Sequence, residues 1–316
     1  MRTFIKGAAV AAFGFVMATG AMAADWTPPG PIKLMIGFAA GGGADTQARL
    51  IAEELETRMG WSFIPEQVTG KGGLNLAAAL KDAPADGSVI GMLVTESLGY
   101  NMRAADAGMS PADFTPIVTT AGFQMGIVAP SSKGWTTFSD MIEAAKGGQD
   151  IRFGTMSPKL SDLAYLLGEA NGVEFNIVQV RGGRAVMDGV NAGDMDLGFM
   201  AGIQAKGVAA GDLVNLASAL SGPLAQTPDA PTLADLGVAF NADGYFMFAG
   251  PAGMPTEARD ALAAAIADVV STDGTKANAL ITRAFGGPTV IAGDDLSALV
   301  ASDFEAAGAL LEAASE

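Results

Sequence analysis

The stretch that decides the fold is IKLMIGFAAGGGADTQAR, from Ile32 to Arg49. Its first residues, Ile32 to Phe38, are apolar and typical of a short buried strand, and Gly41 to Gly43 predict a tight turn. Asp45 to Met59 then carry apolar side chains at helical spacing, and Gly60 is placed to end that helix. A strand that turns through glycines into a helix leaves the first N–H groups of the helix unpaired, at the positive end of the helix dipole. The stretch therefore predicts an anion site made from the backbone alone.

A targeting segment precedes this stretch. Arg2 and Lys6 are followed by an apolar run over residues 8–17 and by Ala21-Met22-Ala23, which is the pattern of a cleavable secretory signal. The apolar run is short for a membrane-spanning helix. We therefore expect residues 1–23 to be a signal peptide, and the rest of the chain to be exported as a soluble protein.

The composition excludes several common classes of enzyme. The chain has no His and no Cys, so it has no Ser-His-Asp triad, no cysteine nucleophile and no ordinary zinc site. It also lacks a calcium-loop motif, and we expect neither a metal nor a cofactor. The formal net charge is −16, and it becomes −18 when the two basic residues of the signal are removed. Such a surface argues against nucleic acid and anionic lipid as partners.

The rest of the chain repeats the opening pattern of strand, loop and helix. Strands are expected at 61–66 and 89–94, the second ending in the polar residues Thr95 and Glu96. A second cycle has a strand at 151–153, a polar loop with Thr155 and Ser157, a strand at 175–180, and a glycine loop flanked by Arg181 and Arg184. In sheets built from right-handed parallel crossovers, the loops after the strands gather at one edge, where ligands bind.

These elements predict an α/β protein of two lobes, each with a parallel-rich sheet flanked by helices. Lobe 1 is expected to comprise residues 24–122 and 243–316, and lobe 2 residues 123–242. The extended stretches 114–129 and 245–250 would be the two crossovers of a hinge.

Five segments of the chain resemble a known family, the periplasmic solute receptors of tripartite tricarboxylate transporters, also called Bug receptors. The resemblance is carried by GFAAGGGADTQAR at 37–49, KDAPADGSVIGML at 81–93, FGTMSPKLSDLA at 153–164, RGGRAVMDGVNAGDMDLGF at 181–199 and FAGPAGMP at 248–255. It implies a two-lobed, type II-like Venus-flytrap fold that closes on a small organic carboxylate. It also implies delivery of that ligand to one large and one small integral membrane subunit. We expect the receptor itself to be a monomer.

The resemblance places the ligand between the glycine loops of the two lobes. The residues expected at the ligand are Phe38, Ala40, Gly41, Gly42, Gly43, Asp45, Thr95, Glu96, Thr155, Ser157, Arg181, Gly182, Gly183 and Arg184. Asp45 has an alternative role as an acid that stabilises the start of a helix, and the two arginines have an alternative as solvated surface residues. The chain departs from the family pattern at Gly37, Ala40, Lys71, Leu74, Val180, Arg184-Ala185 and Met200-Ala201. The last pair replaces an acid and an amide, which favours a ligand with a more apolar end than citrate.

Two other functions remain open from the residues. Glu66 lies about where a dinucleotide-binding domain places its ribose-binding acid, so a secreted dinucleotide- or carboxylate-processing enzyme is one alternative. The glycine loop lacks the third glycine of that fingerprint, with Thr46 in its place, and it lacks the Gly-Lys-Ser/Thr of a P-loop. The other alternative is a sensory binding protein that uses the same site without transport.

Overall fold

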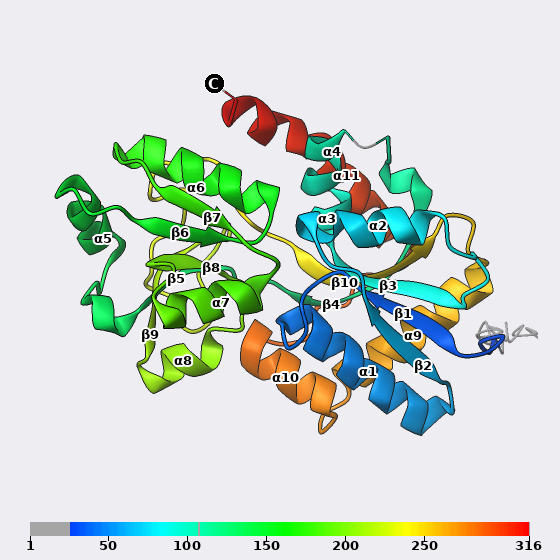
Figure 1. Cartoon of the computed structure of the whole chain (residues 1–316). Helices are drawn as coiled ribbons and strands as arrows, with labels where there is room; N and C mark the ends of the chain where they lie inside the picture. Colours follow the sequence, from blue (N-terminus) through cyan, green and yellow to red (C-terminus); the bar gives the residue numbers. More distant parts are fainter. Residues whose placement is uncertain (1–25, 107, 316) are drawn as a thin grey trace, which may run out of the picture.

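The computed structural model describes residues 26–106 and 108–315, so the expected signal peptide, residues 1–23, lies outside the described residues. Two five-stranded sheets form the two halves of the molecule, each between layers of helices (Figure 1). The first sheet has the order β2-β1-β3-β10-β4 and the second the order β7-β6-β8-β5-β9. The predicted two-lobed α/β class is confirmed, and each sheet is mixed, with two parallel and two antiparallel pairs of neighbouring strands.

The first sheet belongs to lobe 1. Its strands are β1 (Ile32–Ile36), β2 (Phe63–Gln67), β3 (Val89–Val94), β4 (Phe114–Gly122) and β10 (Tyr245–Pro251). β1 runs parallel to both β2 and β3, whereas β10 runs antiparallel to β3 and β4. Successive residues of β1 face opposite sides, so Leu34 packs in one apolar cluster and Met35 in another. This sheet is therefore buried on both faces, as a parallel sheet requires.

Helices from both ends of the chain cover the first sheet (Figure 1). One face carries α1 (Gly43–Met59), α9 (Thr256–Ser271) and α10 (Lys276–Phe285). The other face carries α2 (Leu74–Lys81), α3 (Thr95–Leu98), α4 (Tyr100–Ala105) and α11 (Gly293–Ala313). A short 3₁₀ turn, η1 (Lys71–Gly73), precedes α2, and a second, η2 (Pro111–Asp113), precedes β4.

The second sheet belongs to lobe 2. Its strands are β5 (Gly126–Pro130), β6 (Arg152–Thr155), β7 (Asn176–Gln179), β8 (Leu197–Met200) and β9 (Leu213–Ser218). Its helices are α5 (Phe138–Lys146), α6 (Pro158–Asn171), α7 (Gly183–Ala192) and α8 (Ala205–Ala210), and a 3₁₀ turn, η3 (Ser131–Lys133), follows β5. The side chain of Asp196 is 3% exposed and pairs with Arg152 and Lys133, which ties the start of β8 to β6 and η3.

The chain passes between the lobes at residues 123–125 and at 219–244. The sequence predicts one extended stretch over 114–129, but the structure divides it into β4 and β5, which lie in different sheets. Between them the N–H of Phe123 donates to the carbonyl of Gly244 and that of Gln124 to the carbonyl of Ala201, so neither continues a strand ladder. The lobe boundaries given above, at residues 122/123 and 242/243, stay a prediction.

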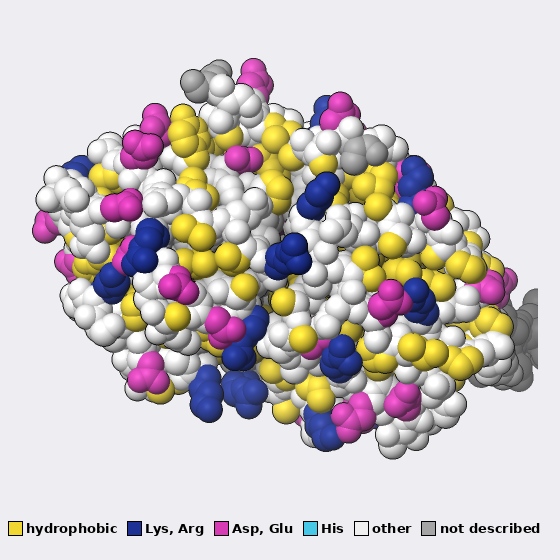
Figure 2. Space-filling model, viewed as in Figure 1, with side chains coloured by type: hydrophobic (Ala, Val, Ile, Leu, Met, Phe, Trp, Pro, Cys, Tyr) yellow, Lys and Arg dark blue, Asp and Glu magenta, His cyan; other side chains and the backbone are white. Residues whose placement is uncertain are grey.

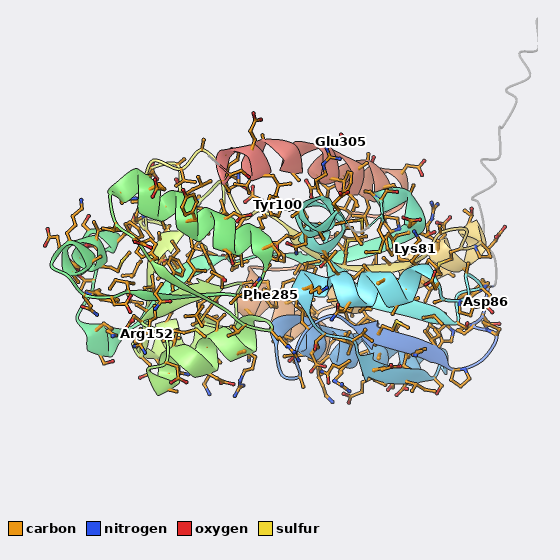
Figure 3. All side chains as sticks on the ribbon, turned by 45° about the horizontal axis from the view of Figure 1, so that its top comes forward. Lys81, Asp86, Tyr100, Arg152, Phe285 and Glu305 are labelled. Carbon is orange, nitrogen blue, oxygen red and sulfur yellow. The ribbon has the colours of Figure 1, made fainter. Side chains whose placement is uncertain are left out.

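The lobes also meet away from these crossovers. The Tyr100 hydroxyl of α4 donates to the Asp162 carboxylate of α6, and Figure 3 shows Tyr100 at this border. Burial raises the pKa of Asp162 above its usual range, and burial together with the neighbouring Asp162 and Glu96 carboxylates raises that of Tyr100. The hydroxyl therefore keeps its proton and acts as the donor between the lobes.

Candidate functional site

A cavity of about 60 Å³ lies between the two lobes. One water molecule needs roughly 10 to 15 Å³ of such space, so the cavity holds about four to six groups of that size. Both lobes contribute to its wall. The lining residues are Phe38, Ala39, Gly42, Gly43, Ala44, Val94, Glu96, Phe123, Met125, Met156, Ser157, Leu160, Gly182, Gly183, Arg184, Ala201, Ile203, Phe246 and Phe285.

The N-terminus of α1 faces this cavity from lobe 1. Gly41 has φ +73°, a conformation that favours glycine, and it turns the chain sharply from β1 into the helix. Gly42 is the N-cap residue and has no side chain to cap the helix. The N–H groups of Gly43 and Ala44 have no hydrogen-bond acceptor among the described residues. These groups are therefore free to bind an anion.

The N-terminus of α7 faces the cavity from lobe 2 in the same way. Its N-cap, Gly182, has φ +101° and offers no capping side chain. Within the described part of the chain, no acceptor pairs with the N–H groups of Gly183 and Arg184. The two helix starts thus place two sets of unpaired donors, one from each lobe, on a single cavity.

The two glycine loops lie in contact across the cleft. A Cβ atom built at Gly42 would be 4.0 Å from the Cβ of Arg184, and one built at Gly182 would be 3.7 Å from the backbone nitrogen of Ala39 and 3.8 Å from the Phe38 ring. These are van der Waals distances. The lobes are therefore closed around the cavity, and glycine allows the backbones to approach this closely.

Three polar side chains reach the cavity wall. Ser157 is the N-cap of α6 and accepts a hydrogen bond from the N–H of Leu160. Arg184 is held by Asp188, with its Nε 2.9 and 3.0 Å from the two carboxylate oxygens. Glu96 is 7% exposed and accepts a hydrogen bond from Asn101.

The rest of the wall is mostly apolar. The rings of Phe123 and Phe246 pack edge to face with centroids 5.1 Å apart, and the Phe246 and Phe285 centroids are 4.9 Å apart. Phe285 ends α10 and lies where the two lobes meet (Figure 3). Met125 and Met156 extend this surface. An apolar wall with a few placed polar groups is typical of a small-molecule site.

The structure brings eight of the predicted residues to the cavity: Phe38, Gly42, Gly43, Glu96, Ser157, Gly182, Gly183 and Arg184. Ala40 and Gly41 belong to the same turn but do not line the cavity. Asp45 is buried, and its carboxylate accepts hydrogen bonds from the Gly41 N–H, Arg49 and Gln67. Asp45 therefore takes the alternative role considered above, as a structural acid at the start of α1.

Two predicted threonines also lie outside the cavity wall. The Thr95 hydroxyl is fully buried and accepts from the Tyr245 N–H, while the Thr155 hydroxyl is bonded to Ser161. The prediction that Thr95 and Glu96 form the tip of a strand is wrong, because the chain turns directly from β3 into the helix α3. That turn directs Thr95 into the sheet and Glu96 to the cavity.

Arg181 lies in a neighbouring pocket that also contains Lys71 and shares Phe38, Met156 and Gly182 with the cavity wall. Neither basic residue has a carboxylate within 4.0 Å among the described residues. Figure 2 shows basic side chains along the border between the two lobes. Arg181 therefore lines the neighbouring pocket and not the main cavity.

Apart from Phe38, sequence reasoning missed the aromatic part of the wall. Phe123 could have been found, because it lies in a predicted crossover and crossover residues border the cleft. Phe246 is one of several apolar residues in β10, and Phe285 ends a helix, α10, that the sequence pattern did not reveal. Nothing local marks these two as cavity residues.

A family model for the tripartite tricarboxylate transporter family receptor matches residues 47–314. The chain belongs to this family. It is 27% identical over 254 residues to the UPF0065 protein in the gbd 5′ region of Cupriavidus necator, covering 78% of this chain and 76% of that protein. It is 26% identical over 262 residues to Protein BugT of Bordetella pertussis, covering 77% and 78% respectively.

Solved structures show the same fold. Rpa4515 of R. palustris, determined with adipate, superposes with a TM-score of 0.80 at 23% identity over 92% of this chain and 99% of that one. MatC from Rhodopseudomonas palustris, with bound malate, superposes with a TM-score of 0.77 at 19% identity over 90% and 99%. BugD gives a TM-score of 0.78 at 22% identity over 92% and 99%.

Family membership decides against the enzyme alternative left open by the sequence. The family is one of receptors, so this chain is a receptor and not an enzyme. In the part of the chain that the structure describes, no helix is both long and apolar enough to cross a bilayer.

Proposed function

We propose that this receptor binds a small organic carboxylate between its lobes in the periplasm and delivers it to a membrane transporter of one large and one small integral subunit. The observation that carries the proposal is the meeting of two uncapped helix N-termini, α1 and α7, at one cavity between the lobes. Relatives of the same fold hold adipate and malate, and both ligands carry the carboxylates that such helix starts bind.

The donors are sufficient for tight binding. A hydrogen bond to a charged group contributes about 1.5 to 3 kcal/mol, and a micromolar dissociation constant needs about 8 kcal/mol. Four N–H groups, at Gly43, Ala44, Gly183 and Arg184, therefore supply the required free energy when closure excludes water. This local attraction acts against the net negative charge of −16, which repels an anion at long range.

The test is calorimetric titration of the protein from Ala24 onward with mono-, di- and tricarboxylates, and with nucleotides as a comparison class. We expect a carboxylate to bind with micromolar or tighter affinity. A protein that binds nucleotides but no carboxylate would refute the proposal. Delivery is tested separately, by ligand uptake into vesicles that contain both membrane subunits, with and without the receptor.

A further inference from the structure

Glu96 is the acidic side chain in the wall of the cavity. It lies on α3, directly after β3, and is 7% exposed. Within the described residues no Lys or Arg nitrogen lies within 4.0 Å of its carboxylate. A buried carboxylate without a cationic partner is costly unless its oxygens accept hydrogen bonds.

Only one Glu96 oxygen is satisfied by the described part of the protein. Oε1 accepts from Asn101 Nδ2 at 3.1 Å, and the same Asn101 nitrogen donates to the carbonyl of Gly72 at 3.0 Å, which fixes the position of the amide. Oε2 has no donor among the described residues, and it is not among the side-chain oxygens sealed inside the protein. Because Glu96 lines the cavity, Oε2 is the oxygen left to interact with a ligand there.

The groups behind Glu96 add no positive charge. Tyr100 and Asp162 are its neighbours, and burial, together with the Asp162 and Glu96 carboxylates, raises the pKa of the Tyr100 hydroxyl. No group of three or more carboxylates suited to a metal ion occurs among residues 26–106 and 108–315. The donor that Oε2 lacks among the described residues is therefore left to a ligand or to water in the cavity.

We infer that Glu96 selects a ligand that carries, besides its carboxylate, a hydrogen-bond-donating group, and that an amino acid zwitterion fits the cavity better than a dicarboxylate. This inference rests on the proposed function. The helix starts α1 and α7 bind the carboxylate, while the free oxygen of Glu96 accepts from the ammonium group. A second carboxylate at Glu96 would place two like charges in an apolar cavity, where they repel strongly.

The experiment compares ligands of equal chain length, so that size does not enter. Straight-chain acids of three to five carbons are titrated calorimetrically as four classes: plain monocarboxylates, hydroxy acids, α- and ω-amino acids, and dicarboxylates. We expect the best amino acid to bind at least about tenfold more tightly than the plain acid of the same length, and the dicarboxylate to bind most weakly.

The matching variant is Glu96→Gln, which keeps an oxygen for Asn101 and turns an amide N–H₂ toward the ligand. It should lose the preference for amino acids and bind dicarboxylates more tightly than the unmodified protein does. Glu305→Gln is the control, because it makes the same charge change on the exposed surface of α11 (Figure 3). It should leave all four affinities unchanged.

Each outcome is decisive. If no acid of any class binds, the proposed function fails, and the inference fails with it. If carboxylates bind but plain acids match amino acids, or if Glu96→Gln keeps the preference, the inference alone is overturned. The ranking of the four classes in the unmodified protein tests the inference even if the variant does not fold.

Discussion

Replacing Gly42 by Val should block closure of the lobes without unfolding either one. Gly42 has φ −76° and ψ 172°, so its backbone accepts any residue. A Cβ atom there would already lie 3.1 Å from the carbonyl oxygen of Ala39 and 4.0 Å from the Cβ of Arg184 in the other lobe. The γ-methyl groups of Val reach about 1.5 Å further, which would bring them within about 2.5 Å of Arg184.

The size of the effect follows from these distances. Carbon atoms need about 3.5 Å, so the lobes must stay about 1 Å further apart than in the closed structure. A hydrogen bond of about 2.9 Å from one lobe to the ligand then exceeds the 3.5 Å limit. Loss of two charge-assisted bonds costs about 3 to 6 kcal/mol, or roughly a 10²- to 10⁴-fold increase in the dissociation constant.

Calorimetry measures this affinity, and small-angle scattering measures whether the ligand compacts the protein. Gly42→Ala is the control, because it carries the same Cβ contact of 3.1 Å with the Ala39 carbonyl oxygen but no γ-methyl groups. The melting temperatures of the two unliganded variants should match each other, and Gly42→Ala should bind with much less loss. Unchanged affinity of Gly42→Val would refute the placement of the ligand between these loops.

Three further predictions concern other contacts. Tyr100→Phe removes the hydrogen bond to Asp162 between the lobes. It should weaken ligand binding by a few fold, measured by calorimetry, with no change in the far-ultraviolet circular dichroism spectrum. An unaltered affinity would show that this bond does not favour closure. Burial alone would raise the pKa of Asp196, but hydrogen bonds from its basic partners outweigh it and hold that pKa at about 2, against 3.8 without these interactions. The ionised Asp196 carboxylate therefore stabilises the fold by about 2 kcal/mol above about pH 4, and this contribution is lost as the pH falls toward 2. Urea unfolding of Asp196→Asn should show a lower free energy of unfolding than the unmodified protein at pH 7 and almost no difference near pH 2. An equal difference at both pH values would contradict the assignment. Arg184→Gln should weaken carboxylate binding by about tenfold and Arg181→Gln by less, because only Arg184 lines the main cavity; the reverse order would place the carboxylate in the neighbouring pocket.

The backbone part of the site could be predicted from the sequence because three consecutive glycines after a buried strand are typical of a tight turn into a helix. The strand, turn and helix at Ile32–Met59 follow from local pattern, and Gly60 ends α1 with φ +68° as expected. The duplicate at Gly182-Gly183 follows from the same reasoning. Local signals specify local geometry, so these elements are found where the residues place them.

What the sequence did not predict depends on contacts between distant segments. Thr95 has the polar character of a loop residue, but Tyr245, 150 residues later, supplies the N–H that buries its hydroxyl. Arg181 and Arg184 differ by less than one helical turn, yet the start of α7 directs one to the cavity and the other to the adjoining pocket. Neither outcome has a signal in the neighbouring residues, because both are decided by how the lobes meet.

The unpaired N–H groups at the starts of α1 and α7 have a consequence for mutagenesis. An alanine scan removes side chains, and these donors are backbone groups, so the proposed backbone contacts to the anion would give no response in such a scan. Replacing single peptide bonds by esters at Gly43 or Gly183 would delete one donor at a time while leaving every side chain in place. It also follows that substitutions around the cavity can change which molecule is bound while the backbone hydrogen bonds to its carboxylate stay the same.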